Sequence, residues 1–254
     1  MTQPFLCKRI SEQLTIDGDL DKTAWSGALR TSRFGAIDNG DLGFFDTRTA
    51  LLWDERALYA AFWVEERDVY CTRSERTGLT WSENTVELYI AGPDAYYTLA
   101  IAPDGRRSEM FFIWKDAYSR GSRYDVPEFD LAVHKPMVFG GDGGPHHERG
   151  MRWGFFDWPF PGLQVAIQID GTIDQRRDID RGWQVEIALP WDGLSRLLDG
   201  PLPPAPSASL SIACARCQMI EHRAASFPAI WTPAPRPAGG LPIPDTYPQW
   251  ALAD

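Results

Sequence analysis

Trp81 stands directly before a short polar run, Ser82-Glu83-Asn84, and Glu87 follows three residues later. An indole ring offers a flat apolar surface, and carboxylates accept strong hydrogen bonds from hydroxyl groups. This combination suits a flat ligand such as a sugar ring, a base or a cofactor. The structural alternative is that Trp81 packs under the edge of the fold and that Glu87 pairs with an arginine.

A second group of aromatic residues lies in residues 115–161, a stretch without helical or strand periodicity that is too long for an ordinary loop. We interpret most of these rings as a satellite hydrophobic cluster beneath the loop. Trp153 and Trp158 are the two that we expect to belong to a lid over a ligand.

The same stretch contains His146-His147-Glu148, which could act in acid–base or metal chemistry. Side chains of adjacent residues diverge on an extended backbone, so the two histidines do not chelate one ion. The preceding glycines favour a solvated surface loop. A metal site would need further ligands, for which the candidates are His134, His222, Asp142 and Asp157.

Cys214 and Cys217 spell C-x-x-C, but they continue an alternating, strand-like segment. Residues three apart on a strand point to opposite faces. We therefore expect free thiols rather than a redox or zinc site.

The composition excludes several classes of protein. The chain has 254 residues and a net charge of −10, which argues against nucleic acid and anionic membrane surfaces as partners. No apolar run is long enough for a transmembrane helix. The N-terminus lacks a signal-peptide pattern, so we expect a cytoplasmic protein if Met1 is the native start, and a secreted one with its signal removed otherwise.

Short segments with period-two alternation, separated by turn signals, dominate the chain and predict an all-β sandwich or barrel. We expect one domain over residues 1–254, with single helical turns near residues 19–25 and 191–198. The predicted strands cover residues 49–53, 57–64, 85–90, 96–101, 109–114, 164–169, 183–189 and 209–217.

Several sequence blocks follow one another along nearly the whole chain. They are IDGDLDKTAW at residues 16–25, LWDERALYAAF at 52–62, WSENTVELYI at 81–90, DGT at 170–172, GWQVEIALPW at 182–191, and the tail around Trp231 and Trp250. In this order, they resemble the blocks of family 9 carbohydrate-binding modules. The resemblance implies a two-sheet antiparallel β-sandwich, jelly-roll-like, with residues 115–161 as a long excursion and residues 228–254 as a proline-rich tail that closes the sandwich.

The resemblance also implies a site. Sugar-binding members clamp a terminal sugar between two tryptophans, and Trp81 matches the first, with Asn84 close by. Glu87 matches a carboxylate that accepts hydrogen bonds from sugar hydroxyls. Thr98 stands near positions where the sugar binders carry arginine and asparagine. The second tryptophan is missing, and Tyr247 is the ring nearest to its position.

Five other tryptophans lie inside the blocks that define the fold, and we expect them in the core. They are Trp25, Trp53, Trp63, Trp183 and Trp191.

The expected function is non-catalytic binding of a saccharide or glycoside, with Trp81 as the stacking platform. One alternative is an enzyme on sugar derivatives that uses His147 or Glu148. Another is a haem-binding relative of the same sandwich, for which Met110, Met137 and His134 are the candidate ligands. Related modules carry structural calcium, so calcium bound by loop oxygens is a further expectation, without named ligands. The sequence leaves the oligomeric state open.

Overall fold

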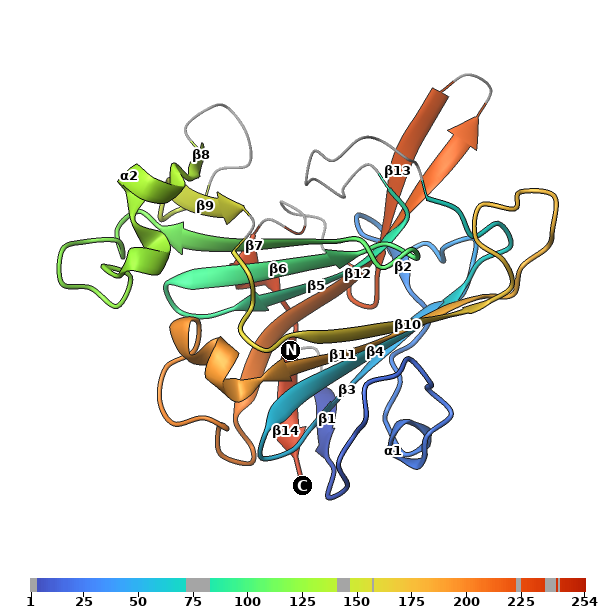
Figure 1. Ribbon diagram of the computed structural model, residues 1–254, viewed down its shortest axis with the longest axis horizontal. Coiled ribbons are helices and arrows are strands. Elements are labelled where there is room, and N and C mark those ends of the chain that lie inside the picture. Colours follow the sequence, from blue (N-terminus) through green and yellow to red (C-terminus); the bar gives the residue numbers. More distant parts are fainter. Residues whose placement is uncertain are drawn as a thin grey trace.

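The computed structural model of the chain describes residues 4–71, 83–140, 147–156, 158–222, 225–235, 241 and 243–254. Within these ranges, fourteen strands form one continuous sheet that folds over on itself into two layers (Figure 1). The order of the main path is β10-β11-β4-β3-β1-β14-β12-β5-β6-β7-β9-β8. We call β10-β11-β4-β3 the first sheet and β12-β5-β6-β7-β9-β8 the second sheet.

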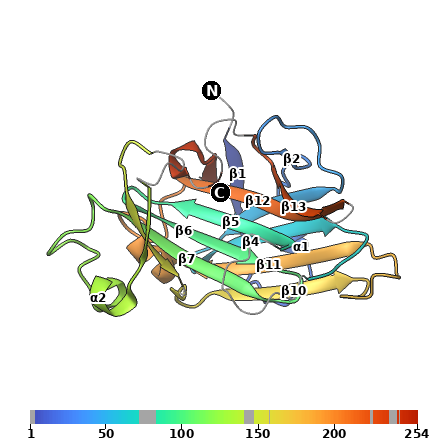
Figure 2. The same ribbon diagram turned by 90° about the horizontal axis from the view of Figure 1, so that it is seen from above.

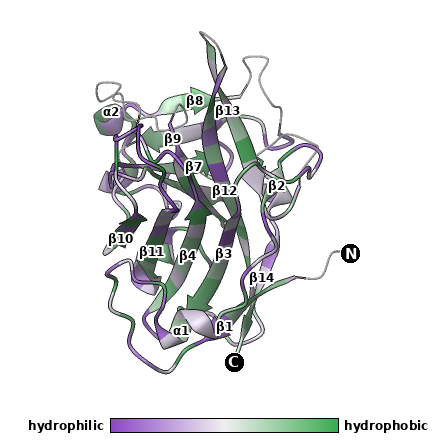
Figure 3. Ribbon diagram, turned by 90° about the vertical axis from the view of Figure 1, so that its right-hand side faces the viewer, coloured by the Kyte–Doolittle hydropathy of each residue, from purple (hydrophilic) through white to green (hydrophobic). Residues whose placement is uncertain are grey.

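The first sheet is built around the hairpin of β3 and β4, whose turn is fixed by one side chain. The Asp54 carboxylate accepts hydrogen bonds from the backbone N–H groups of Arg56 and Ala57, at 2.8 and 2.9 Å. The strands of this sheet are β3 (Thr47–Trp53), β4 (Ala57–Glu65), β10 (Gln164–Asp170) and β11 (Gly182–Pro190). Figure 3 shows the hydrophobic stretches along β3, β4 and β11.

The second sheet contains an antiparallel meander of β5, β6 and β7. Part of the predicted excursion joins this sheet: β9 pairs with β7, and β8 pairs with β9. The described residues 137–139 and 152–156 of the excursion are therefore strands of the second sheet. The strands are β5 (Thr85–Ala91), β6 (Ala95–Ile101), β7 (Arg107–Trp114), β8 (Met137–Phe139), β9 (Arg152–Phe156) and β12 (Ser209–His222).

Two strands near the chain ends join the sheets. β1 (Phe5–Arg9) pairs in parallel with β3 and with β14 (Gln249–Ala253), and β14 pairs antiparallel with β12. The predicted antiparallel sandwich is confirmed, and the parallel pairs at β1 are an addition that the sequence patterns do not predict. β12 also pairs with β13 (Ala225–Thr232), with which it projects from the body (Figure 1), and β13 pairs with β2 (Gly35–Ala36).

Helical structure is limited to single turns. The predicted turn near residues 19–25 is α1 (Thr23–Ser26), and the one near 191–198 is the 3-10 helix η3 (Trp191–Arg196). The others are η2 (Pro127–Phe129), α2 (Leu131–His134) and η4 (Pro244–Thr246). No helix in the described ranges is long and apolar enough to cross a membrane.

The main hydrophobic core lies between the two sheets, which are stacked in Figure 2. Aromatic residues of the excursion enter this core instead of forming a satellite cluster, among them Tyr124, Phe129 and Phe155. Of the five tryptophans expected in the core, Trp25, Trp53, Trp183 and Trp191 are at most 2% exposed. Trp63 differs, because it lies on the outer face of the first sheet and is partly exposed.

The N-terminal segment covers part of that outer face. Leu14, Leu20 and Trp25 pack on small and aromatic residues of β3, β4 and β11 and form a second buried cluster. The two cysteines of the C-x-x-C pair are buried and neither forms a disulfide, as predicted: Cys214 lies in the main core, and the alternation of β12 places Cys217 on the opposite face.

Candidate functional site

The outer face of the second sheet, turned away from the core, brings together three of the predicted site residues, Glu87, Thr98 and Tyr247. Tyr89, Thr98 and Met110 are direct neighbours across β5, β6 and β7. Glu87 is one step along from Tyr89 on the same face of β5, opposite Ala100. Tyr89 and Met110 are partly exposed.

Glu87 is a buried carboxylate, 6% exposed. It accepts a hydrogen bond from the Tyr89 hydroxyl at 2.5 Å and one from the Thr85 hydroxyl at 3.2 Å. Burial raises the pKa of Glu87, and these two hydroxyl donors oppose that rise only in part. Its interactions are therefore with hydroxyl groups, and it forms no ion pair with arginine among the described residues.

Thr98 lies beside this carboxylate in the floor of the face and is 5% exposed. Its hydroxyl oxygen has no hydrogen-bond partner within the described ranges. A buried hydroxyl without a partner destabilises a fold by about 1–3 kcal/mol. Such a group marks a position where an external polar partner would be bound favourably.

Asn84 and Glu83 fix the chain at the start of β5. The Asn84 side chain donates to the Tyr70 carbonyl at 3.2 Å and accepts from the Met219 N–H at 2.8 Å. Glu83 forms a two-point ion pair with Arg106 at 2.7 and 2.8 Å. Asn84 thus ties three segments together. Trp81, the predicted platform, lies outside the described residues.

Tyr247, which follows η4, packs against the same face. Its ring meets the Tyr89 ring edge-on at 6.0 Å, and its hydroxyl donates to the Leu241 carbonyl at 2.6 Å. Because Tyr247 is only 3% exposed, it supports Tyr89 rather than presenting an open ring of its own.

Trp153 and Trp158 do not join this group. Trp153 alternates with Arg152 and Gly154 on β9 and packs toward the main core. Trp158 lies in that core against Tyr97, Phe111 and Phe129. Trp158 also lines a cavity of about 440 Å³ on the core side of the excursion, with His134 and Glu128 at its edge. The structure thus places the two tryptophans on the opposite side of the second sheet from Glu87 and Thr98.

His147 bridges the excursion and the C-terminal tail. Its ring stacks on Trp114 at 4.1 Å, its Nε2 lies 2.8 Å from the Asp245 carboxylate, and its Nδ1 accepts from the Arg149 N–H at 3.1 Å. Because the backbone N–H occupies Nδ1, the Nε2 nitrogen carries the proton and donates to Asp245. Both ring nitrogens are therefore engaged, while Glu148 is exposed.

An aromatic end of the same face was not predicted. Tyr96, Phe112 and Trp114 form a buried cluster there. The Arg152 guanidinium lies 5.4 Å from the Trp114 ring and 5.8 Å from the Tyr96 ring. These contacts hold β9 against β7 and β6.

The described candidates for haem and metal chemistry lie apart from one another. Met110 lies on β7 of the outer face, Met137 is 54% exposed on β8, and His134 is an exposed residue of α2. Among the described residues, no group of three His, Cys, Asp or Glu side chains could hold a metal ion. His146, Asp142 and Asp157 lie outside the described residues, as does the side chain of His222, and structural calcium stays a prediction.

Tyr89 is the site residue that the sequence reasoning missed. The signal was present, since the alternation in VELYI places Tyr89 on the same face as Glu87.

No protein-family model matches the chain, and no curated protein matches it either. Among solved structures, a Bacteroides uniformis protein described as carbohydrate-binding is similar, with a TM-score of 0.58 and 12% identity over 98% of each chain. A family 9 carbohydrate-binding module from Caldicellulosiruptor kristjanssonii, solved with cellotriose, gives a TM-score of 0.53 and 10% identity over 99% of this chain and 94% of that chain. At the level of fold, the chain is a β-sandwich of the kind seen in family 9 carbohydrate-binding modules.

Proposed function

We propose that the chain is a non-catalytic domain that binds a saccharide or glycoside on the outer face of its second sheet. The observation that carries the proposal is the Thr98 hydroxyl, buried beside Glu87 without a partner among the described residues. A ligand hydroxyl would supply that partner and remove the desolvation penalty of the threonine oxygen.

The surrounding groups fit a sugar. The Glu87 carboxylate already accepts hydrogen bonds from two hydroxyls, and a carboxylate has room to accept more. Tyr89 is partly exposed and presents an aromatic ring next to Thr98. The C–H face of a pyranose packs favourably on aromatic rings.

Trp81 completes the proposal as the stacking platform. It precedes Glu83 by two residues, and the buried Glu83 carboxylate is held by the exposed guanidinium of Arg106. The similar module from Caldicellulosiruptor kristjanssonii was solved with cellotriose, and this guides the choice of the first probe.

Isothermal titration with cellotriose, xylotriose and mannotriose tests the proposal. We expect binding of at least one triose, lost in Trp81→Ala and weakened about tenfold in Thr98→Val, which is about 1.4 kcal/mol. Phe44→Ala is the matched control, since Phe44 is 72% exposed on another part of the surface. The proposal fails if the chain binds none of the trioses, or if Trp81→Ala and Thr98→Val bind them as tightly as the unchanged chain does.

A further inference from the structure

Trp63 is a partly exposed tryptophan in the middle of the first sheet, on its outer face. The strand register aligns four outward side chains in one row across β3, β4, β11 and β10. In order, they are Arg48, Trp63, Gln184 and Gln168. A flat indole is thus flanked by planar polar groups that donate and accept hydrogen bonds.

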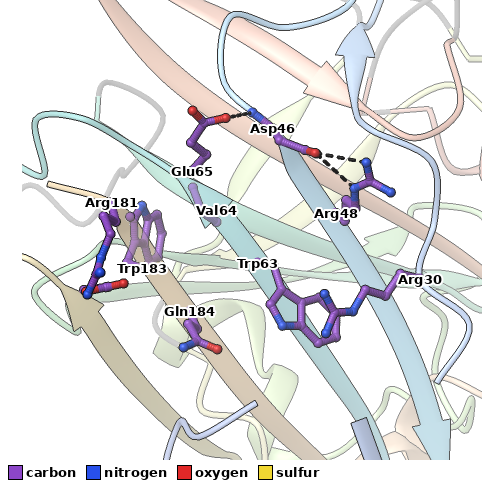
Figure 4. Close-up of a pocket in the computed structure, with 11 residues that line it drawn as sticks. Arg30, Asp46, Arg48, Trp63, Val64, Glu65, Arg181, Trp183 and Gln184 are labelled. Atoms are coloured by element: carbon purple, nitrogen blue, oxygen red, sulfur yellow. Dashed lines mark hydrogen bonds and ion pairs between the residues drawn. The ribbon is translucent and has the colours of Figure 1, made fainter. Parts of the chain in front are cut away.

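The next row along the strands carries acidic groups. Glu65, Gly182 and Asp170 are cross-strand neighbours on β4, β11 and β10. Gly182 places no side chain between the residues Glu65 and Asp170, and its backbone packs closely on β4, since an added Cβ would lie 2.0 Å from the Val64 carbonyl oxygen. A cavity of about 300 Å³ lies over these two rows (Figure 4), at the lower end of the range for small-molecule sites.

The N-terminal segment that contains Leu14, Leu20 and Trp25 covers the outer face of the first sheet and ends beside the row of Trp63. Trp25, the last large ring of that segment, meets Trp63 edge-on at 6.1 Å. The guanidinium of Arg30 lies over the Trp63 ring, at 3.8 Å from the ring centre. Arg30 is exposed, and such a contact is worth only about 0.5–1 kcal/mol. A ligand ring can therefore replace it at small cost.

The charges around the cavity are balanced. The Arg48 guanidinium binds the Asp46 carboxylate at 3.0 Å, and Arg181 binds Asp170 at 2.5 Å. With Arg30 and Glu65 included, the lining has three cationic and three anionic side chains and therefore no net charge. A neutral ligand with hydroxyl groups matches this balance, whereas a purely apolar ligand would strip water from these polar groups without replacing their hydrogen bonds.

We propose that this cavity is a second saccharide site, in which a neutral sugar ring stacks on Trp63 and its hydroxyls bond to Gln184 and Glu65. Alternating donors and acceptors around an aromatic ring match the hydroxyl array of an uncharged pyranose. The site lies on the opposite outer face of the sandwich from Glu87 and Thr98, and it does not depend on the function proposed for that face.

Backbone and side-chain NMR of the full chain tests this directly. The ¹⁵N-labelled protein is titrated with cellotriose, xylotriose and mannotriose. We expect the indole N–H of Trp63 and the side-chain amide of Gln184 to shift together and to saturate with at least one triose. Gln184→Ala, a change on a solvent-facing strand position, should weaken that titration about tenfold, and Phe44→Ala should leave it unchanged.

A third variant separates this site from the one on the second sheet. In Thr98→Val, the shifts at Trp63 and Gln184 should persist with the same midpoint. The second-site proposal is overturned if Trp63 and Gln184 stay unperturbed by all three trioses, even when residues near Glu87 respond. It is also overturned if trigalacturonate shifts them and the neutral trioses do not.

Discussion

Trp25 donates its indole N–H to the Glu186 carboxylate at 2.8 Å, joining two segments that lie 161 residues apart. The same carboxylate, fully buried, accepts the N–H groups of Asp17 and Gly18 and the Lys22 ammonium. The IDG…W block and the GWQVEIALPW block are therefore two halves of one buried hydrogen-bonded cluster. It fixes the N-terminal segment on the first sheet. It therefore also fixes where that segment stops covering the sheet, beside Trp63.

Replacing Glu186 should be one of the most destabilising single changes in the chain. Glu186→Ala leaves the Trp25 indole and the N–H groups of Asp17 and Gly18 without their acceptor. Each such buried donor costs about 1–3 kcal/mol, so we expect a loss of about 3–5 kcal/mol of unfolding free energy. Urea denaturation followed by circular dichroism measures this. Glu12→Gln, at an exposed position, is the control and should change stability by less than about 0.5 kcal/mol. A similarly small loss for Glu186→Ala would show that the cluster does not anchor the segment.

The strands were predictable where β-branched, aromatic or alternating residues run over five or more positions between turn signals. β3 to β7, β10, β11 and the first part of β12 follow that pattern. β1, β9 and β14 did not, because each has five residues and the burial that would mark it comes from partners distant in the sequence. Pairing between the two ends of the chain leaves no local signal.

The candidate site was predictable only in part, for a related reason. Alternation places Glu87 and Tyr89 on one face, and cross-strand register adds Thr98. The sequence ALYAAFWV is apolar throughout, so it does not show that Trp63 is partly exposed. The N-terminal segment buries the outer face of β4 next to Trp63 and leaves Trp63 itself partly uncovered. Which tryptophan faces solvent depends on where another segment stops, and that is a property of tertiary structure.

Arg216 and Glu66 form a buried ion pair at the edge of the core, 1% and 4% exposed, with a distance of 2.5 Å. Burial lowers the pKa of Arg216 to about 10 and raises that of Glu66 against the opposing charge of Arg216. Arg216→Met should cost about 3–5 kcal/mol, because it leaves the Glu66 carboxylate buried alone. Adding Glu66→Leu should recover most of that loss in a double-mutant cycle. If the losses of unfolding free energy in Arg216→Met and Glu66→Leu simply add in the double variant, the interaction between these two residues is not the cause of the loss.

Glu87 should make the free energy of unfolding fall as the pH rises through its raised pKa. Its pKa is raised in the folded chain, chiefly by burial, so the native state binds the proton more tightly than the unfolded chain does. Its contribution is fully present below the ordinary glutamate pKa near 4.5 and is lost as pH rises through the raised value. The unfolding free energy of Glu87→Gln, relative to the unchanged chain, should therefore increase from pH 4 upward and then level off.

Urea titrations of both proteins between pH 4 and pH 8 measure that difference. Glu12→Gln, treated in the same way, corrects for the loss of one carboxylate from an exposed position. A constant difference between Glu87→Gln and the unchanged chain across this range would mean that the folded environment does not favour the neutral acid.

Thr98→Val should weaken ligand binding without lowering the free energy of unfolding. The Thr98 hydroxyl is buried without a partner among the described residues, so its replacement by a methyl group of similar size removes a desolvation penalty. We expect the unfolding free energy to stay the same or to rise by up to about 1 kcal/mol. Thr49→Val is the matched comparison, because the Thr49 hydroxyl donates to the Ala61 carbonyl at 2.9 Å. That variant should lose about 1 kcal/mol. If Thr98→Val is destabilised as much as Thr49→Val, its hydroxyl has a partner within the folded chain, and the case for a ligand at that position is lost.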